Sequence, residues 1–196
     1  MNWELVPVVA PKIGRTYAFV RVTAAMRRAA VGGVNVFGTR DASENVDRDG
    51  RVSVVREGAT LAVGRDVAAP PDRTARALRD TRRWPDWSPS VRGVESTDRY
   101  VETGTTGRVR VAGAWVPFRV TSATRLRWDW EVAGIPATGH RVDRYSGNPD
   151  RCRAVIEVPL IAAPYVPVCR RALDRFAALV KGELPQRGPS VETSEH

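Results

Sequence analysis

The sequence has few of the residues that bind metals or form disulfides. Its 196 residues include two cysteines, Cys152 and Cys169, and two histidines, His140 and His196. Two cysteines cannot build a disulfide framework, and their spacing fits no CxxC zinc motif. Two histidines leave an ordinary zinc site short of ligands. We therefore expect a cytoplasmic protein with reduced thiols, no metal and no cofactor.

A long uninterrupted apolar run is also missing. The most apolar stretch, residues 154–169, contains Glu157 and three prolines, which prevent it from forming a membrane-spanning helix. The apolar run at residues 5–10 is too short for the core of a secretory signal peptide. We therefore predict no membrane span.

Lysine is nearly absent although the chain is strongly basic. Only two of the 31 basic residues are lysines, and the formal net charge is +9. Because the arginines are spread along the chain, we interpret them mainly as a solvated surface and expect no nucleic-acid partner. The strongest local exception is a stripe with an arginine at every third position, formed by Arg73, Arg76, Arg79 and Arg82. Besides a solvated surface, this stripe could be an interaction site that docks on an acidic partner or on RNA.

Residues 1–56 show no regular pattern. A glycine pair at 32–33 and a polar block at 41–50 interrupt any periodicity. We interpret residues 1–56 as an N-terminal extension, which is either flexible or the result of a start codon assigned too early. A single domain is expected over residues 57–183, followed by a polar tail over 184–196.

Regular patterning begins near residue 59. It predicts a strand at 60–67 and a helix at 72–83, which the motif Trp84–Pro89 ends because proline disfavours helical backbone in the residue before it. Tight turns are expected at Gly113–Ala114 and over residues 146–150. Six short strands follow the helix, at residues 91–97, 106–112, 115–121, 125–132, 138–145 and 151–158.

The strand at 125–132 has the clearest pattern. Leu126, Trp128, Trp130 and Val132 alternate with charged residues. This period of two indicates a sheet with one covered face and one solvated face.

Common catalytic motifs are missing. The sequence contains no GxSxG elbow, no Walker loop, no GxGxxG after a predicted strand and no HExxH. The carboxylates of the predicted strands fall on the solvated face, which also disfavours a two-carboxylate hydrolase. These carboxylates are Asp129, Glu131 and Glu157.

The C-terminal part follows a helical period. Apolar side chains from Val166 to Val180 recur at steps of three and four, and Gly182 is placed to end the helix. A one-sided sheet needs a cover, and this helix is the only other long element with an apolar face. We therefore predict an α+β fold in which sheet and helix leave a cleft for an apolar ligand.

Several segments between residues 59 and 182 follow one another in a characteristic order. They are Val67–Pro71, Arg83–Pro89, Gly104–Val109, Leu126–Val132, Gly139–Val142 and the last strand with its helix. In this order they resemble the START-like superfamily (SRPBCC), specifically its polyketide cyclase/dehydrase and lipid-transport family. The resemblance implies a helix-grip fold, a curved antiparallel sheet wrapped around a long C-terminal helix. It also implies an internal cavity for a lipid, an isoprenoid or an aromatic polyketide.

Several apolar side chains are candidates for the cavity wall. Trp128 and Trp130 could form a flat wall for the ligand or could simply pack in the core. Trp84 and Trp87 could gate the cavity mouth, or could form a structural knot that anchors the first helix. Other candidates on the covered face are Phe118 and Ile156.

Three polar side chains are candidates for orienting the ligand. Strand parity places His140 inward, where it could act as a general acid or base or could be a hydrogen-bonded core histidine. Arg144 shares that parity and could clamp a carboxylate or enolate, or bend into solvent. Tyr165 could donate its hydroxyl to a ligand or cap the core.

Two function hypotheses follow from these residues. The first is binding of a hydrophobic small molecule in the internal cavity. The alternative is a polyketide cyclase or dehydratase that uses the same cavity, with His140 or Arg144 handling protons and enolate charge.

Overall fold

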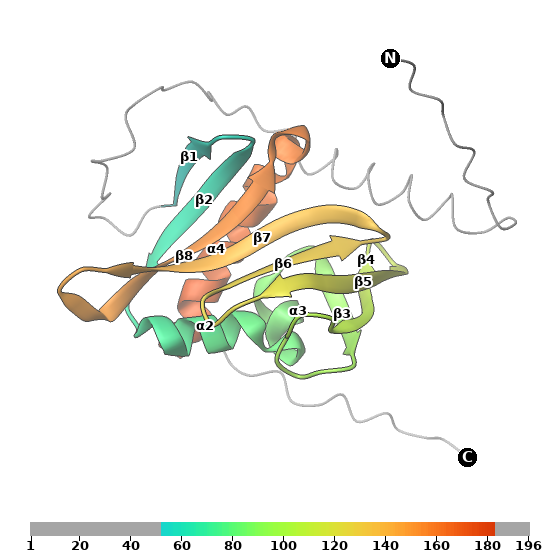
Figure 1. The fold of residues 1–196 in the computed structure, drawn as a ribbon, viewed down its shortest axis with the longest axis horizontal. Helices are drawn as coiled ribbons and strands as arrows, with labels where there is room; N and C mark the ends of the chain where they lie inside the picture. The colour runs from blue at the N-terminus through green and yellow to red at the C-terminus, as the bar shows by residue number, and fades with distance from the viewer. Residues whose placement is uncertain (1–51, 183–196) are drawn as a thin grey trace, which may run out of the picture.

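The computed structural model describes residues 52–182 (Figure 1). The tail predicted at 184–196 and nearly all of the extension predicted at 1–56 lie outside the described residues. Residues 52–56 are the exception, and residues 53–56 belong to a strand, β1 (Ser53–Glu57), that the sequence did not predict. β1 forms a hairpin with β2 (Thr60–Val67).

An antiparallel sheet of eight strands dominates the structure, in the order β1-β2-β8-β7-β6-β5-β4-β3. All six strands predicted between residues 91 and 158 are present. Register shifts in the pairs β5–β6, β6–β7 and β7–β8 bend the sheet. The six strands are β3 (Val91–Ser96), β4 (Thr106–Val111), β5 (Ala114–Ala123), β6 (Arg127–Val132), β7 (Ile135–Tyr145) and β8 (Asn148–Pro159).

Tight turns make two of the strands longer than predicted. The turn between β7 and β8 is Ser146–Gly147, not the whole of 146–150, so β8 begins three residues earlier than predicted. β7 gains three residues at its start, because the turn after β6 is only Ala133–Gly134. The β4–β5 turn is Ala112–Gly113, one residue before the predicted pair. Both residues have positive φ, 51° and 86°, as a type I′ turn requires.

The helix predicted at 72–83 is divided into two pieces, and a third short helix follows them. α2 (Pro71–Arg79) ends where Asp80 adopts an extended backbone, and a short 3₁₀ turn, η1 (Thr81–Arg83), follows. The Trp-Pro motif was predicted only to end the helix. It forms a one-turn helix, α3 (Trp84–Trp87), because Pro85 lies in the first turn, where its missing N–H is tolerated.

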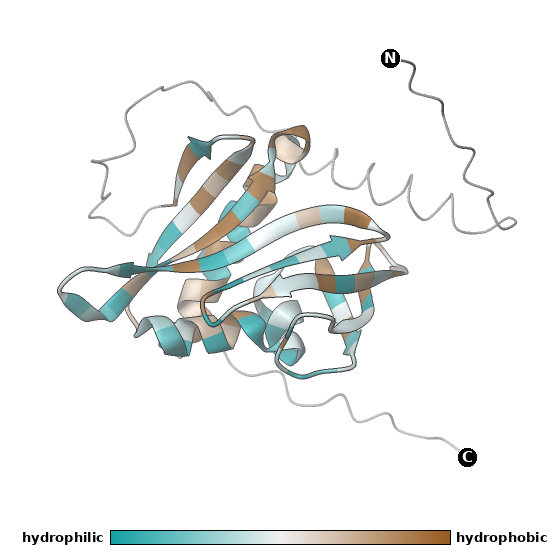
Figure 2. Ribbon diagram, in the orientation of Figure 1, coloured by the Kyte–Doolittle hydropathy of each residue, from teal (hydrophilic) through white to brown (hydrophobic). Residues whose placement is uncertain are grey.

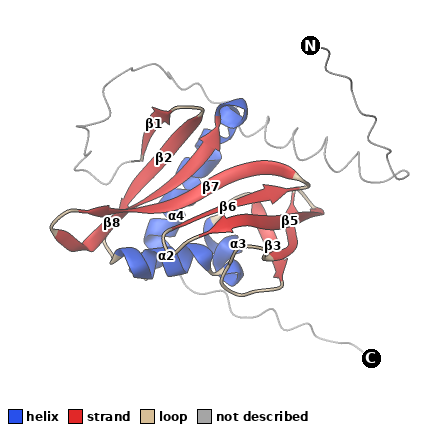
Figure 3. Cartoon of the chain, in the orientation of Figure 1, coloured by secondary structure: helices blue, strands red, loops and turns tan. Residues whose placement is uncertain are grey.

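The long C-terminal helix covers one face of the sheet, as predicted. After the 3₁₀ segment η2 (Leu160–Tyr165), α4 (Val166–Lys181) packs against β2 and β8 of the sheet, and α2 and α3 lie on the same face (Figure 3). Gly182 ends α4 in a left-handed conformation with φ of 87°. The structure therefore has the helix-grip fold. No helix within residues 52–182 is long and apolar enough to cross a membrane.

The opposite face of the sheet is polar, as expected, but it is not uniformly solvated. Hydrophobic and hydrophilic residues alternate along the strands (Figure 2). Glu157 points to this polar face, yet it is only 7% exposed. Arg127 approaches its carboxylate to 2.6 Å, and Arg141 forms a second ion pair with it. The arginines thus cover a carboxylate that the sequence placed in water.

Close backbone approach at β4 leaves no room for a side chain at Gly107. A Cβ at Gly107 would overlap the backbone oxygen of Glu95 and lie 2.7 Å from the Phe118 ring. We expect Gly107→Ala to lower the free energy of unfolding by about 2 kcal/mol or more in urea denaturation.

Gly93→Ala on the neighbouring strand is the matched control. Its Cβ would come closest to the indole of Trp115, at 3.1 Å, and this side chain is 39% exposed and free to shift. The expected loss is less than about 1 kcal/mol. Equal losses in the two variants would contradict the role of Gly107.

Candidate functional site

Six rings from the sheet and α3 form one aromatic cluster on the covered face. Cross-strand pairing sets their positions, because Trp128 of β6 lies directly opposite His140 of β7. Four of the predicted site residues therefore come together through the sheet and two through α3. The aromatic cluster consists of Phe118, Trp128, Trp130, His140, Trp84 and Trp87.

Three of these rings form a continuous stack. Trp84 lies parallel to Trp128 with ring centroids 5.3 Å apart and planes inclined by 4°. His140 stacks on Trp128 at 3.9 Å and 7°. Trp130 and Trp87 meet the stack edge-on. Trp87 also contacts Phe176 of α4 edge-on, which links the cluster to the C-terminal helix.

Trp84 fills the space under the sheet. It is 2% exposed, and its Nε1 donates a hydrogen bond to the Leu78 carbonyl at 3.1 Å. This packing matches the structural-knot interpretation of Trp84. Leu173 and Phe176 of α4 are also fully buried in the same core. Side chains thus occupy the middle of the predicted cleft.

Three ring nitrogens of the cluster are buried without a hydrogen-bond partner among the described residues. They are Nε1 of Trp87, Nε1 of Trp128 and Nδ1 of His140. The indole of Trp130 differs, because its Nε1 donates to Oγ1 of Thr138 at 3.3 Å. Buried polar groups are normally paired, and an unpaired one costs about 1–3 kcal/mol. The aromatic cluster therefore contains three buried ring nitrogens that could form a hydrogen bond with a ligand.

His140 is inward-facing, as strand parity predicted. It is 4% exposed, and burial lowers its pKa from 6.5 to about 3, opposed only by the charge of Asp129. The imidazole is therefore neutral near neutral pH and protonates only in acid. A neutral ring can donate or accept one hydrogen bond at Nδ1, depending on its tautomer.

The remaining predicted site residues have separate surroundings. Ile156 is buried beside His140, its partner across β7 and β8. Tyr165 bonds its hydroxyl to Oγ of Ser90 at 2.6 Å, and burial raises its pKa to about 12. Arg144 does not reach the aromatic cluster: its side chain is 52% exposed and pairs with Asp72 at 3.3 Å. Its predicted role as an inward clamp does not match this position.

Both cysteines are free and buried, and burial raises the pKa of the Cys169 thiol to about 12. Such a thiol is not an activated nucleophile. No three His, Cys, Asp or Glu side chains within residues 52–182 lie close enough together to hold a metal ion.

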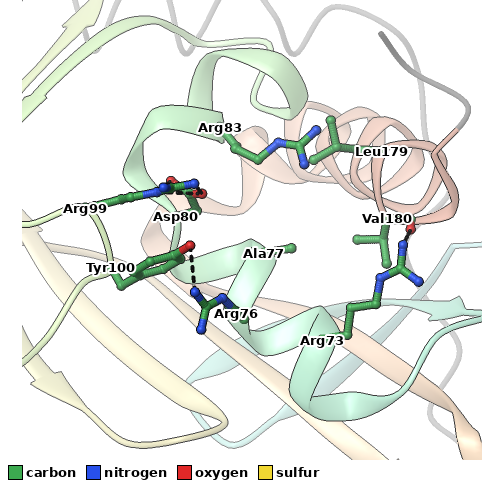
Figure 4. Close-up of a pocket in the computed structure, with 9 residues that line it drawn as sticks. All are labelled: Arg73, Arg76, Ala77, Asp80, Arg83, Arg99, Tyr100, Leu179 and Val180. Carbon is green, nitrogen blue, oxygen red and sulfur yellow. Dashed lines mark hydrogen bonds and ion pairs between the residues drawn. The ribbon is translucent and has the colours of Figure 1, made fainter. Parts of the chain in front are cut away.

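A pocket of about 230 Å³ opens on the other side of the helices, away from the predicted cleft (Figure 4). It lies between α2, the loop after β3 and the C-terminal end of α4. Sequence reasoning singled out only the part on α2, because nothing indicated that the β3–β4 loop would fold against it. Its polar residues are Arg73, Arg76, Arg83, Arg99, Asp80 and Tyr100, which we call the arginine pocket.

Comparison with known proteins gives a consistent picture. Residues 51–181 match the family model described as polyketide cyclase/dehydrase and lipid transport. A START superfamily protein from Mycobacterium smegmatis superposes with a TM-score of 0.51 at 13% identity, covering 65% of this chain and 100% of its own. A protein from Arthrobacter aurescens gives 0.50 at 13% identity, covering 74% and 98%. At this identity the two structures support the fold alone. A search of curated proteins found no match.

The depressed pKa of His140 predicts a pH-dependent stability. In the unfolded chain the imidazole binds a proton below about pH 6.5, whereas the folded chain excludes it down to about pH 3. Stability due to this group is therefore complete above pH 6.5 and is lost as the pH falls, by about 1.4 kcal/mol per unit.

Urea unfolding of the wild type and His140→Phe, each at neutral pH and at about pH 4.5, measures this effect. Phenylalanine keeps a stacking ring but cannot titrate. We expect the wild type to lose about 2–3 kcal/mol more than the variant over this interval. Identical losses would show that His140 is not buried in a neutral form.

Proposed function

Because the chain belongs to the polyketide cyclase/dehydrase and lipid transport family, we propose that it binds an apolar small molecule against the aromatic cluster. In this proposal a single hydrogen-bond-accepting oxygen of the ligand, a carbonyl or hydroxyl, orients it beside His140. The ligand is a lipid, an isoprenoid or an aromatic polyketide-like compound. The chain acts as a binding protein.

One observation carries this proposal. The indole N–H groups of Trp87 and Trp128 and Nδ1 of His140 are buried and unpartnered within one cluster. An oxygen with two lone pairs can accept from an indole N–H, and the ring of His140 supplies a further donor or acceptor. Binding would recover the cost of about 1–3 kcal/mol for a buried group that the oxygen pairs. A pure hydrocarbon would not recover it.

Ligand access requires a side chain to move, and Trp87 is the best candidate. Trp84 is fixed by its hydrogen bond to Leu78, whereas the N–H of Trp87 has no partner among the described residues. Trp87 contacts His140 and Phe176 edge-on, so its displacement exposes both rings. Apolar contact would then contribute about 25 cal/mol per Å² of buried surface.

The same geometry favours binding over the cyclase or dehydratase alternative. With a pKa near 3, His140 is a weak base and is not protonated at neutral pH. Arg144 is engaged with Asp72 and half-exposed. Neither of the two weak catalytic candidates is therefore placed to move protons on a ligand in the cluster.

A matched pair of ligands tests the proposal. 9-Fluorenone and fluorene have nearly the same shape, but only fluorenone carries a carbonyl oxygen. We expect fluorenone to bind about tenfold more tightly, which corresponds to one net hydrogen bond of about 1.4 kcal/mol. Tryptophan fluorescence titration measures the affinity. The indole N–H signals of Trp87 and Trp128 in a nitrogen–proton correlation spectrum report the contact.

Two conservative variants complete the test. Trp128→Phe removes an unpaired donor and is expected to bring the two affinities close together while fluorene binding changes little. Trp130→Phe is the control, because its indole N–H is already committed to Thr138. It should keep the preference for fluorenone. The proposal fails if neither compound binds, or if the preference is absent in the wild type.

A further inference from the structure

We propose that the arginine pocket binds a phosphate group, presented either by a small phosphate ester or by a phospholipid headgroup. The pocket is separate from the aromatic cluster and lies on the opposite side of α2 and α4 from the sheet. This inference therefore does not depend on the ligand proposed for the core.

The balance of charge in the pocket favours an anion. Arg99 forms an ion pair with Asp80 at 3.0 Å. Arg83 lies 3.6 Å from Asp86. Arg73 and Arg76 have no carboxylate within ion-pair distance among residues 52–182. Among residues 52–182, two guanidinium groups thus have no carboxylate partner beside two that are paired, and the described part of the site has a net positive charge.

The two uncompensated arginines are already held in place. They are three residues apart on α2 and therefore share a face of the helix. Arg73 donates from Nη2 to the Val180 carbonyl of α4 at 3.1 Å. Arg76 lies over the Tyr100 ring, 4.4 Å from its centroid, and donates to its hydroxyl at 3.1 Å (Figure 4). Because the side chains are ordered beforehand, less conformational entropy is lost when an anion binds.

Both guanidinium groups keep donors for a ligand. A guanidinium has five N–H donors, and the contacts with Val180 and Tyr100 use one nitrogen of each. The planar fork of arginine matches the oxygens of phosphate. Several arginines around one site stabilise a doubly charged anion such as phosphate more than they stabilise a singly charged carboxylate.

The other wall of the pocket is apolar. Ala77 of α2 and Leu179 and Val180 of α4 line it. This wall can contact the carbon part of a phosphate ester or the glycerol region of a lipid. The volume of about 230 Å³ has room for a phosphate with a small organic group. A nucleic-acid strand would instead need an extended basic surface, whereas Asp80 interrupts the row of arginines in this pocket.

Binding of two probes tests the inference. Phenyl phosphate is titrated by calorimetry, and phosphatidylcholine vesicles with and without phosphatidic acid are used in a co-sedimentation assay. We expect Arg73→Gln/Arg76→Gln to weaken binding of the responding probe by about tenfold or more. If phenyl phosphate binds, a small phosphate ester is sufficient for recognition. If the protein binds only the vesicles that contain phosphatidic acid, the ligand is a phospholipid headgroup.

The control variant is Arg110→Gln/Arg119→Gln. These exposed arginines lie on β4 and β5, and their removal lowers the net charge by the same amount. Their loss should change binding by less than about twofold, because screened charges at a distance contribute little. Equal weakening in both double variants, or no binding of either probe to the wild type, would overturn the proposal.

Ala77→Glu protects the test against a folding artefact. It places a carboxylate in the pocket without removing the contacts of Arg73 and Arg76, and it should weaken binding of the responding probe at least as much as the double variant. Thermal unfolding followed by circular dichroism checks that each variant is folded. Unchanged binding in a folded Ala77→Glu variant would also overturn the proposal.

Discussion

The stacking of Trp84 on Trp128 is the contact on which the remaining structure depends. It joins α3, which is only one turn long, to the middle of the sheet. Helices this short have no stability of their own, so tertiary contacts must hold α3 in place. His140 extends the stack across β7, and Phe176 connects it to α4 through Trp87. The two layers of the fold therefore meet at aromatic rings, whose large buried area stabilises both.

The polar face of the sheet accommodates many of the arginines by pairing them with carboxylates. Glu157 is buried by Arg127 and Arg141, and Gly139 lies beside it. A side chain at residue 139 would collide with the carboxylates of Asp129 and Glu157, so the glycine leaves room for the ion pairs. Long arginine side chains shield the strands with their methylene groups while the guanidinium groups remain paired. The positive charge is thus partly built into the fold.

The parts of the structure with a strict period could be predicted from the sequence. Alternation of apolar and charged residues over 125–132 predicted the strand and its covered face. Apolar residues recurring every three or four positions predicted the C-terminal helix. Asp80 was harder, because an acidic residue inside a helical pattern carries no local sign that its backbone will be extended. β1 was missed since its five residues follow a long segment without periodicity.

The sequence predicted which residues form the candidate site better than it predicted how their side chains are hydrogen-bonded. Parity placed Trp128, Trp130 and His140 on one face, and the structure brings them together. Whether an indole N–H finds a partner depends on tertiary neighbours, so the unpaired nitrogens could not be inferred. The arginine pocket depends on the β3–β4 loop, which brings Arg99 and Tyr100 against α2. No periodic pattern reports on such a contact.

The pairing of β2 with β8 has a consequence for how the chain is made. The side chain of Arg153 on β8 donates a hydrogen bond to the carbonyl of Gly64 on β2, although the two residues are 89 positions apart in sequence. A ribosome therefore releases the β1–β2 hairpin long before its partner strand exists. During that time one edge of β2 remains open to wrong pairing, and contacts of such long range also slow folding. Correct assembly of the sheet must wait until nearly the whole domain has been synthesised.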